Sequence, residues 1–409
     1  MIPKIIVDTN QSYKTYEISD FRKDFLGKGE FAKVYKLKDM STGEVVAGKI
    51  VAKQKSDKTK KRQRDKIAQE ISLHRTLSNQ YIVKLFSFFQ DQHFVYLILE
   101  LCRHRSLMEL HKSRKAITEP ETRYYMNQIL IGVKYLHDNK IVHRDLKLGN
   151  IFLNDNMEIK LGGFGLATQV DYEGERKQSL RGNPYFIAPE VLQKKGHSYE
   201  VDIWSLGCIL YTLLVGNAPF KTSSLKDTHN RIKNNEYHIP PIVSPLAKRL
   251  IFKLLQSDPT KRPTIDEMLC DDFMTGGYMP TQLSVSCLTM VPRFDSEPNQ
   301  SLIARSPGHL MEINEDIIAP EDPNTSGIME DENGEGGGNA TPGPSPTGPV
   351  PANGSGSPEL TLEPEPPQDE PNNNVAASGS DSDISELTVD TVVALVHQDQ
   401  PNEDEPTEP

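Results

Sequence analysis

Short runs in which apolar and polar residues alternate fill the first hundred positions, and this pattern is typical of strands. The runs span 21–29, 32–39, 44–53, 82–89 and 93–102. Between the third and fourth lies a run with helical periodicity, 64–77, in which Ile67, Ile71, His74 and Leu77 share one face. This order predicts a small, mostly antiparallel sheet with one helix.

After position 106 the periodicity becomes that of helices. The run 118–139 begins at Thr118 with Glu121 three residues later, which is the spacing of a capping box. The run 200–216 is apolar almost all round and predicts a buried helix. Two amphipathic runs follow, at 244–256 and 264–273, and the last helix is expected to end near 274. The fold class is therefore α+β, with a small antiparallel lobe followed by a mainly helical lobe.

Charge and composition divide the chain near position 295. Residues 1–295 contain 45 basic and 33 acidic residues, whereas 296–409 contain one basic and 24 acidic residues. The second part is rich in Gly, Pro and Ser and predicts a disordered acidic tail. Within it, 383–398 has apolar residues at helical spacing, as a docking helix or a transient helix would have. We expect a lead-in at 1–20, a two-lobed domain at 21–274, an extension at 275–295 and the tail at 296–409.

Three features of the sequence indicate where in the cell the protein is found: its cysteines, its N-terminus and a basic run. The four cysteines show no metal-ligand spacing and predict reduced thiols in or near the core. No signal peptide and no apolar run of membrane-spanning length is present. These features favour the cytosol or nucleus. The basic run 53–66 is interpreted either as a solvated connecting loop or as a nuclear-import signal.

A glycine-rich turn and a lysine suggest phosphate binding in the first lobe. The turn consists of Gly27, Lys28, Gly29, Glu30, Phe31, Ala32, Lys33 and Val34. Glycine lets backbone N–H groups approach phosphates, although an ordinary turn has the same pattern. Lys49 lies inside an apolar strand, where it requires a partner, and Glu70 is the candidate. Such a pair would direct the ammonium group to nucleotide phosphates; the alternative is a surface ion pair.

The run His143–Asn150 is the most specific chemical signal. Asp145 would accept the proton of an incoming hydroxyl, Lys147 would neutralise charge on a phosphoryl group, and Asn150 would hold one Mg²⁺. Further on, Glu190 and Arg262 are expected to form a buried structural ion pair. Asp202 is expected to hold the backbone of the 143–150 loop.

These motifs resemble those of the Polo-like serine/threonine protein kinases over 21–295, above all in GKGEFAKVY, which ends at Tyr35, and in HRDLKLGN. The resemblance implies a bilobal protein-kinase fold that binds ATP and Mg²⁺. It implies Leu99 as gatekeeper and a hinge in which Glu100 and Cys102 contact the nucleotide. It also implies a monomer that binds neither nucleic acid nor membrane. Its substrates would carry Ser or Thr near acidic residues, and its role would be mitotic, in cytoplasm and nucleus, at the spindle or centrosome.

The sequence departs from the family at three places. Gly163 stands where the family has the aspartate that binds Mg²⁺, so metal binding is expected to be weakened or lost. In the activation segment, Ser179 occupies the place of the activating phospho-threonine, and Asn183 replaces a threonine that contacts the catalytic Asp and Lys. Residues 296–409 lack the strands and aromatic residues of polo boxes.

Two functions remain open from the sequence. The first is a Ser/Thr kinase impaired by Gly163. The second is a pseudokinase that binds partners or competes with an active Polo kinase. A further alternative is that the acidic tail acts as an internal pseudosubstrate or binds partners of its own.

Overall fold

The computed structural model describes residues 2–8, 14–29, 32–54, 57–172, 174–178 and 182–294. The expectations for the tail, including 383–398, lie outside these residues. The same holds for the assignments of Glu30, Phe31 and Ser179.

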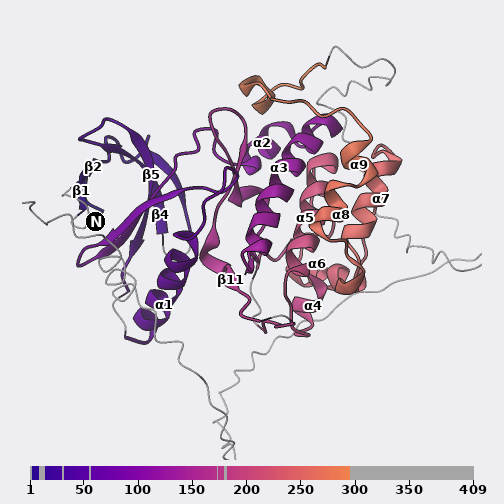
Figure 1. Cartoon of the computed structure of the whole chain (residues 1–409), viewed down its shortest axis with the longest axis horizontal. Helices are drawn as coiled ribbons and strands as arrows, with labels where there is room; N and C mark the ends of the chain where they lie inside the picture. The colour runs from indigo at the N-terminus through magenta and orange to yellow at the C-terminus, as the bar shows by residue number, and fades with distance from the viewer. Residues whose placement is uncertain are drawn as a thin grey trace, which may run out of the picture. The chain divides into compact units, whose positions relative to one another are not determined.

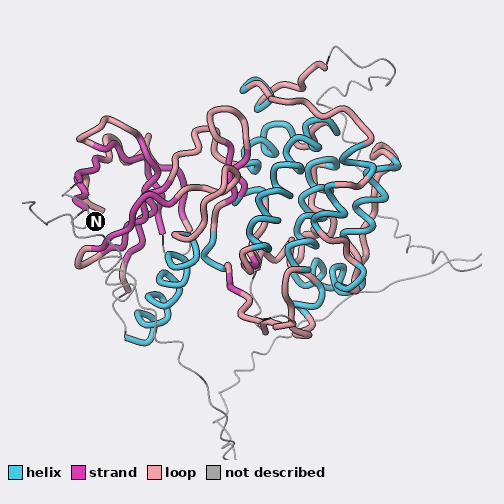
Figure 2. The backbone as a smooth tube through the Cα atoms, in the orientation of Figure 1, coloured by secondary structure: helices cyan, strands magenta, loops and turns pink. Residues whose placement is uncertain are grey.

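An antiparallel sheet and one long helix make up the first lobe (Figures 1 and 2). The strands pair in the order β1-β2-β4-β5-β7-β6, and β3 pairs with β4. Their bounds are β1 Ile5–Asp8, β2 Lys14–Glu17, β3 Phe25–Lys28, β4 Ala32–Asp39, β5 Val45–Ala52, β6 Leu85–Gln90 and β7 Phe94–Leu99. The helix is α1, Asp57–His74. The strands from 21 onward fall within the predicted runs, except that β6 ends one residue beyond the run 82–89.

The first twenty residues are more than a lead-in, and that prediction is corrected. β1 pairs with β2, and β2 pairs with β4, so both strands belong to the sheet. Ile6, Tyr16 and Ile18 are buried in one apolar cluster with residues of β4 to β7. Burial of these side chains explains why two strands of four residues are stable here.

The basic run 53–66 is also different from the expected connecting loop, because α1 already begins at Asp57. Lysine, arginine and glutamine are good helix formers, and this stretch contains neither glycine nor proline. The apolar face was predicted correctly for Ile67, Ile71 and His74, which are all buried. Leu77 is buried as well but lies beyond the end of the helix.

Helices dominate the second lobe (Figure 2). They are α2 Leu107–Arg114, α3 Glu119–Asp138, α4 Pro189–Leu192, α5 Glu200–Val215, α6 Leu225–Asn234, α7 Pro245–Leu254, α8 Ile265–Leu269 and α9 Asp272–Thr275. The short strands are β8 Ile141–Val142, β9 Ile151–Leu153, β10 Ile159–Leu161 and β11 Thr168–Gln169, and the 3₁₀ helices are η1 Leu148–Asn150, η2 Phe164–Leu166, η3 Pro259–Lys261 and η4 Val285–Leu288. The predicted capping box of Thr118 and Glu121 starts α3. As expected, α5 is buried along nearly its whole length.

Two details of the second lobe differ from expectation. The run 264–273 forms two short helices, because the side chain of Asp271 caps a new helix by accepting from the backbone N–H of Phe273 at 2.9 Å. Cys270, at this break, is exposed, whereas Cys102, Cys208 and Cys287 are buried as predicted.

Within the described ranges, no helix combines the length and apolar character needed to cross a bilayer.

Candidate active site

The turn between β3 and β4 leaves open space around its glycines. Among the described residues, and leaving chain neighbours aside, a Cβ at Gly27 or Gly29 would meet no atom within 4 Å. The backbone N–H of Gly29 donates to the carbonyl oxygen of Ala32 at 2.8 Å and so closes the turn. Lys28, between the two glycines, is exposed. Backbone this accessible can lie close to phosphate oxygens.

The register of β4 and β5 decides which side chains share a face with Lys49. Val34 pairs with Lys49 across the two strands. Because side chains alternate along a strand, Val34 lies on the face of Lys49, whereas Lys33 and Tyr35 project from the other face. Tyr35 is buried there among aromatic rings. The side chains of Lys33 and Tyr35 therefore face away from Lys49, and the assignment of these two residues to the nucleotide site stays a prediction that concerns their backbone.

Lys49 and Glu70 form the predicted ion pair, with 2.5 Å between Nζ and Oε1. The side chains are 22% and 11% exposed, so the pair is largely shielded from water. β5 supplies the lysine and α1 the glutamate, and the contact joins sheet to helix. A lysine in an apolar strand is stable only with such a partner.

The connection from β7 to α2 begins directly after Leu99. The backbone N–H of Glu100 donates to the carbonyl oxygen of Lys84 at 2.9 Å, and its carboxylate lies 2.9 Å from Nζ of Lys160. Cys102 is buried, and burial together with the charge of Glu100 raises the pKa of its thiol to about 12. Cys102 therefore remains a neutral, apolar part of this connection.

The loop 143–150 brings the three predicted catalytic and metal-binding residues together. Oδ2 of Asp145 accepts hydrogen bonds from Nζ of Lys147 at 2.7 Å and from Nδ2 of Asn150 at 2.9 Å. Nδ2 of Asn150 also donates to the carbonyl oxygen of Asp145 at 2.8 Å. Two donors on one oxygen fix the orientation of the Asp145 carboxylate. Its position suits a general base for a hydroxyl.

Asp202 holds the backbone of the 143–150 loop in place, as expected. Its carboxylate accepts from the backbone N–H groups of His143 and Arg144, both at 2.9 Å. Arg144 has φ +61°, a left-handed conformation that a non-glycine residue adopts only when its surroundings impose it. Burial would raise the pKa of Asp202, but hydrogen bonds from His137 and His143 outweigh it, and the pKa is lowered.

His143 links the loop to the segment that carries Gly163. Its Nδ1 accepts from the backbone N–H of Asp145 at 3.2 Å, so its Nε2 carries the proton and donates to the carbonyl oxygen of Gly162 at 3.0 Å. Burial lowers the pKa of His143, in agreement with a neutral ring.

Gly163 adopts φ +82°, and the amide of Asn150 lies across the space where a side chain would begin. A Cβ at 163 would be 2.6 Å from Cγ of Asn150 and 2.8 Å from its Nδ2 and Oδ1. The side chain of Asn150 thus takes up room that a residue larger than glycine would need. The position supplies no carboxylate to a metal.

Phe164 packs between the two lobes. Its ring lies 4.7 Å from the ring of His74 in α1 and 5.2 Å from the ring of His143, centroid to centroid. All three side chains are buried. Phe164, the residue after Gly163, therefore packs the segment that contains Gly163 against α1 and against the 143–150 loop.

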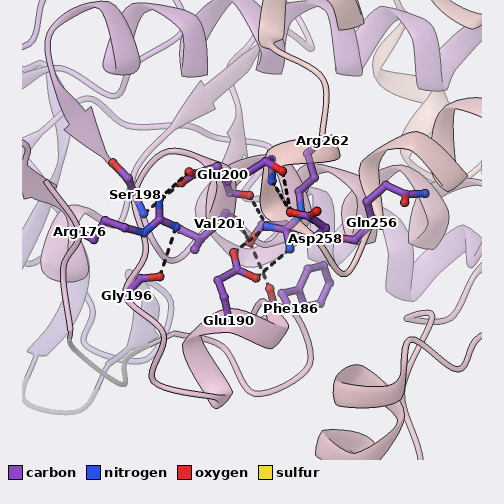
Figure 3. A network of polar contacts seen from close by, with 12 residues as sticks. Arg176, Phe186, Glu190, Gly196, Ser198, Glu200, Val201, Gln256, Asp258 and Arg262 are labelled. Atoms are coloured by element: carbon purple, nitrogen blue, oxygen red, sulfur yellow. Dashed lines mark hydrogen bonds and ion pairs between the residues drawn. The ribbon is translucent and has the colours of Figure 1, made fainter. Parts of the chain in front are cut away.

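The segment 174–178 docks on the loop before α5 (Figure 3). Lys177 and His197 exchange two backbone hydrogen bonds of 2.8 and 3.0 Å. Arg176 reaches Oε1 of Glu200 at 3.0 Å and the carbonyl oxygen of Gly196 at 3.3 Å. Gly196 has φ +78°, and a Cβ there would lie 3.0 Å from Cβ of Arg176, so a larger residue would disturb the contact.

The network continues into the second lobe (Figure 3). Arg262 forms the predicted buried pair with Glu190, through contacts of 2.7 and 2.8 Å. The same guanidinium donates to the carbonyl oxygen of Glu200 at 2.9 Å. Sequence analysis missed Arg176 and Gly196, because nothing in the chain between 176 and 196 signals that they meet.

The side chain of Asn183 makes a local contact. Its side-chain oxygen accepts from the backbone N–H of Tyr185 at 3.0 Å, a local turn typical of asparagine. Asn183 lines the same small cavity as Asp145. Among the hydrogen bonds of the described chain, none joins Asn183 to Asp145 or Lys147.

The residues present fit a nucleotide better than they fit a metal. The open glycine turn and Lys49 can hold phosphates, with Lys147 beside Asp145 for a transferred group. For Mg²⁺, Asn150 offers one amide oxygen, and Gly163 offers nothing. Within the described ranges, no three His, Cys, Asp or Glu side chains gather as a metal site.

Comparison with known proteins agrees with this geometry. Residues 21–274 match the model of the protein kinase domain. The chain is 57% identical over 300 residues to serine/threonine-protein kinase PLK1 of Xenopus laevis, which covers 73% of this chain and 49% of that protein. It is 52% identical over 322 residues to serine/threonine-protein kinase polo of Drosophila melanogaster (78% and 54%) and 41% identical over 333 residues to PLK2 of Mus musculus (81% and 48%).

The chain spans about half the length of these curated relatives. The expected fold of a small antiparallel lobe with one helix and a helical lobe is confirmed. The chain belongs to the protein kinase family, and its Polo-like kinase relatives share more than two fifths of its aligned residues.

Proposed function

We propose that this chain is a Polo-like serine/threonine kinase that transfers the γ-phosphoryl group of ATP to protein hydroxyls, slowed by Gly163. One observation carries the proposal: Asp145, Lys147 and Asn150 are joined by hydrogen bonds of 2.7 to 2.9 Å, so the machinery for the transfer is assembled. The Lys49–Glu70 pair supplies the phosphate-binding group on the other side of the site.

Each of these side chains has a defined task in the transfer. Lys49, held by Glu70, binds the α- and β-phosphates. Asp145 accepts the proton of the Ser or Thr hydroxyl while the oxygen of that hydroxyl forms a bond to the γ-phosphorus. The bond from that phosphorus to the ADP oxygen breaks. Lys147 neutralises charge on the moving group. ATP, when bound, supplies the phosphoryl group and the leaving group.

Gly163 lowers the rate in this proposal because it removes one preorganised charge near the phosphates. Loss of a single charge-stabilising group costs roughly a hundredfold to a thousandfold in rate. Asn150 and the nucleotide's own oxygens would remain as ligands for Mg²⁺.

We also propose the substrate class and setting. The net charge of +12 over 1–295 favours Ser or Thr sites near acidic residues. A role in the cell cycle, in cytoplasm and nucleus with the spindle or centrosome as sites of action, rests on the Polo-like resemblance. Imaging of the tagged chain through mitosis tests the location, and a diffuse signal at every stage would contradict it.

The direct test is phosphate transfer by the full chain to acidic Ser/Thr peptides in Mg²⁺ or Mn²⁺, read by mass spectrometry. Asp145→Asn is the matched control, since it keeps shape and loses the base. The proposal expects slow transfer that disappears in Asp145→Asn. Equal signal in both proteins would point to a contaminating kinase, and no transfer by either would refute the proposal.

A pseudokinase is the second candidate, favoured by the crowding of Gly163 by Asn150. In that case the fold binds partners or competes with an active Polo kinase. Adding the Asp145→Asn protein to an active Polo-like kinase and its substrate tests this idea. Competition requires a fall in that kinase's rate, and an unchanged rate at excess would contradict it.

A further inference from the structure

Gln63 is a buried amide in the first half of α1. It is 6% exposed. Its Nε2 donates to the carbonyl oxygen of Ala52 at 2.9 Å, and its Oε1 accepts from the backbone N–H of Gln54 at 3.0 Å. Both backbone groups lie at the end of β5. One side chain therefore satisfies a donor and an acceptor where the strand leaves the sheet.

The same two elements carry the Lys49–Glu70 pair. Glu70 follows Gln63 by seven residues, close to two helical turns, so both side chains lie on one face of α1. Ala52 follows Lys49 by three residues on β5. Between the two polar contacts, Ile67 packs in the apolar cluster that holds this interface together. α1 is thus fixed to β5 at two points, by an amide and by an ion pair.

The first half of α1 is strongly basic. Residues 57–66 contain six basic and two acidic side chains. Positive charge near the N-terminus of a helix opposes the helix dipole, and like charges repel one another. Among 61–66, Gln63 is the one buried side chain. Gln63 therefore supplies a buried contact between this basic part of the helix and the sheet.

We propose that Gln63 is a positioning residue that keeps α1 docked on β5, so that Glu70 meets Lys49 before any nucleotide binds. The inference rests on the proposed function in one respect: the proposed function assigns nucleotide binding to the Lys49–Glu70 pair. Loss of Gln63 releases the helix, weakens the pair and lowers ATP affinity. From the two hydrogen bonds removed, the expected loss is about five- to 150-fold.

The test uses the full chain with Gln63→Met, which keeps length and loses both hydrogen bonds, and Arg62→Ala as the matched control at an exposed neighbour. Hydrogen exchange is measured without nucleotide at Gln54 and across 61–70, and ATP affinity is measured by equilibrium titration. The proposal expects faster exchange and weaker ATP binding in Gln63→Met, with neither change in Arg62→Ala. Unchanged exchange in Gln63→Met would overturn it.

A double-mutant cycle separates positioning from general loss of stability. If Gln63 acts through Glu70, then Gln63→Met lowers ATP affinity in the wild-type chain and causes no further loss when Glu70→Gln is already present. An equal loss in both backgrounds would overturn the proposal. If the wild-type chain binds no ATP, the proposed function fails, and the exchange at Gln54 and 61–70 alone decides on Gln63.

Discussion

Replacing Gly163 by aspartate places a carboxylate beside Asn150, and the structure predicts opposite effects on stability and on metal binding. At φ +82° a Cβ costs about 1–2 kcal/mol. The new Cβ also displaces the amide of Asn150, which holds two hydrogen bonds to Asp145 worth about 0.5–1.5 kcal/mol each. The free energy of unfolding should therefore fall by about 2–5 kcal/mol without ligand.

Gly163→Ala is the matched control, because alanine has the same strain and crowding without the carboxylate. Urea unfolding should show both variants less stable than wild type. Adding Mg²⁺ to saturating ATP should stabilise Gly163→Asp more than it stabilises wild type or Gly163→Ala, and the transfer rate of Gly163→Asp should rise by about a hundredfold or more over wild type. A Gly163→Ala protein as stable as wild type would refute the crowding argument. A Gly163→Asp protein that binds Mg²⁺ with ATP but transfers no faster would refute the view that one ligand limits the rate.

Three further outcomes follow from the second lobe. Arg262→Met strands the carboxylate of Glu190 in the core and should lower the free energy of unfolding by about 3–5 kcal/mol; a loss below 1 kcal/mol would contradict a buried, coupled pair. Gly196→Ala, strained at φ +78° and crowded, should speed hydrogen exchange at 174–178, and unchanged exchange there would show that the docking does not need glycine. Burial lowers the pKa of His143 below its ordinary 6.5, so the stability due to its neutral form is complete above about pH 6.5 and is lost as pH falls further. The urea midpoint should thus drop from pH 7.5 to 5.5, and a constant midpoint would contradict this.

Local pattern was sufficient for much of the fold and for the centre of the site. β4 alternates in polarity, β5 and β7 are short and mostly apolar, and the run that forms α5 is apolar almost all round, so hydrophobic pattern alone predicts these elements. The motif at 143–150 is contiguous, and its residues meet within one loop. The Lys49–Glu70 pair was predictable because a lysine in an apolar strand needs a partner.

What the sequence left unpredicted depends on contacts between distant segments. β1 and β2 are too short to be recognised alone and become strands through a shared core with β4 to β7. The first half of α1 has no apolar periodicity, and Gln63 gives no sign that its amide caps the end of β5. The crowding of Gly163 by Asn150 depends on the conformation of two loops, which no spacing rule contains.

The most direct test of the account is the affinity of the full chain for ATP as a function of Mg²⁺ concentration, measured by equilibrium titration with Lys49→Met as the control. The account predicts that ATP binds without Mg²⁺, that Lys49→Met weakens this binding, and that saturating Mg²⁺ improves wild-type affinity by less than about tenfold, or about 1.4 kcal/mol. Strong dependence on Mg²⁺ in the wild-type chain would contradict the proposal that metal binding is weak because Gly163 offers no ligand. No ATP binding at any Mg²⁺ concentration would contradict the nucleotide site itself.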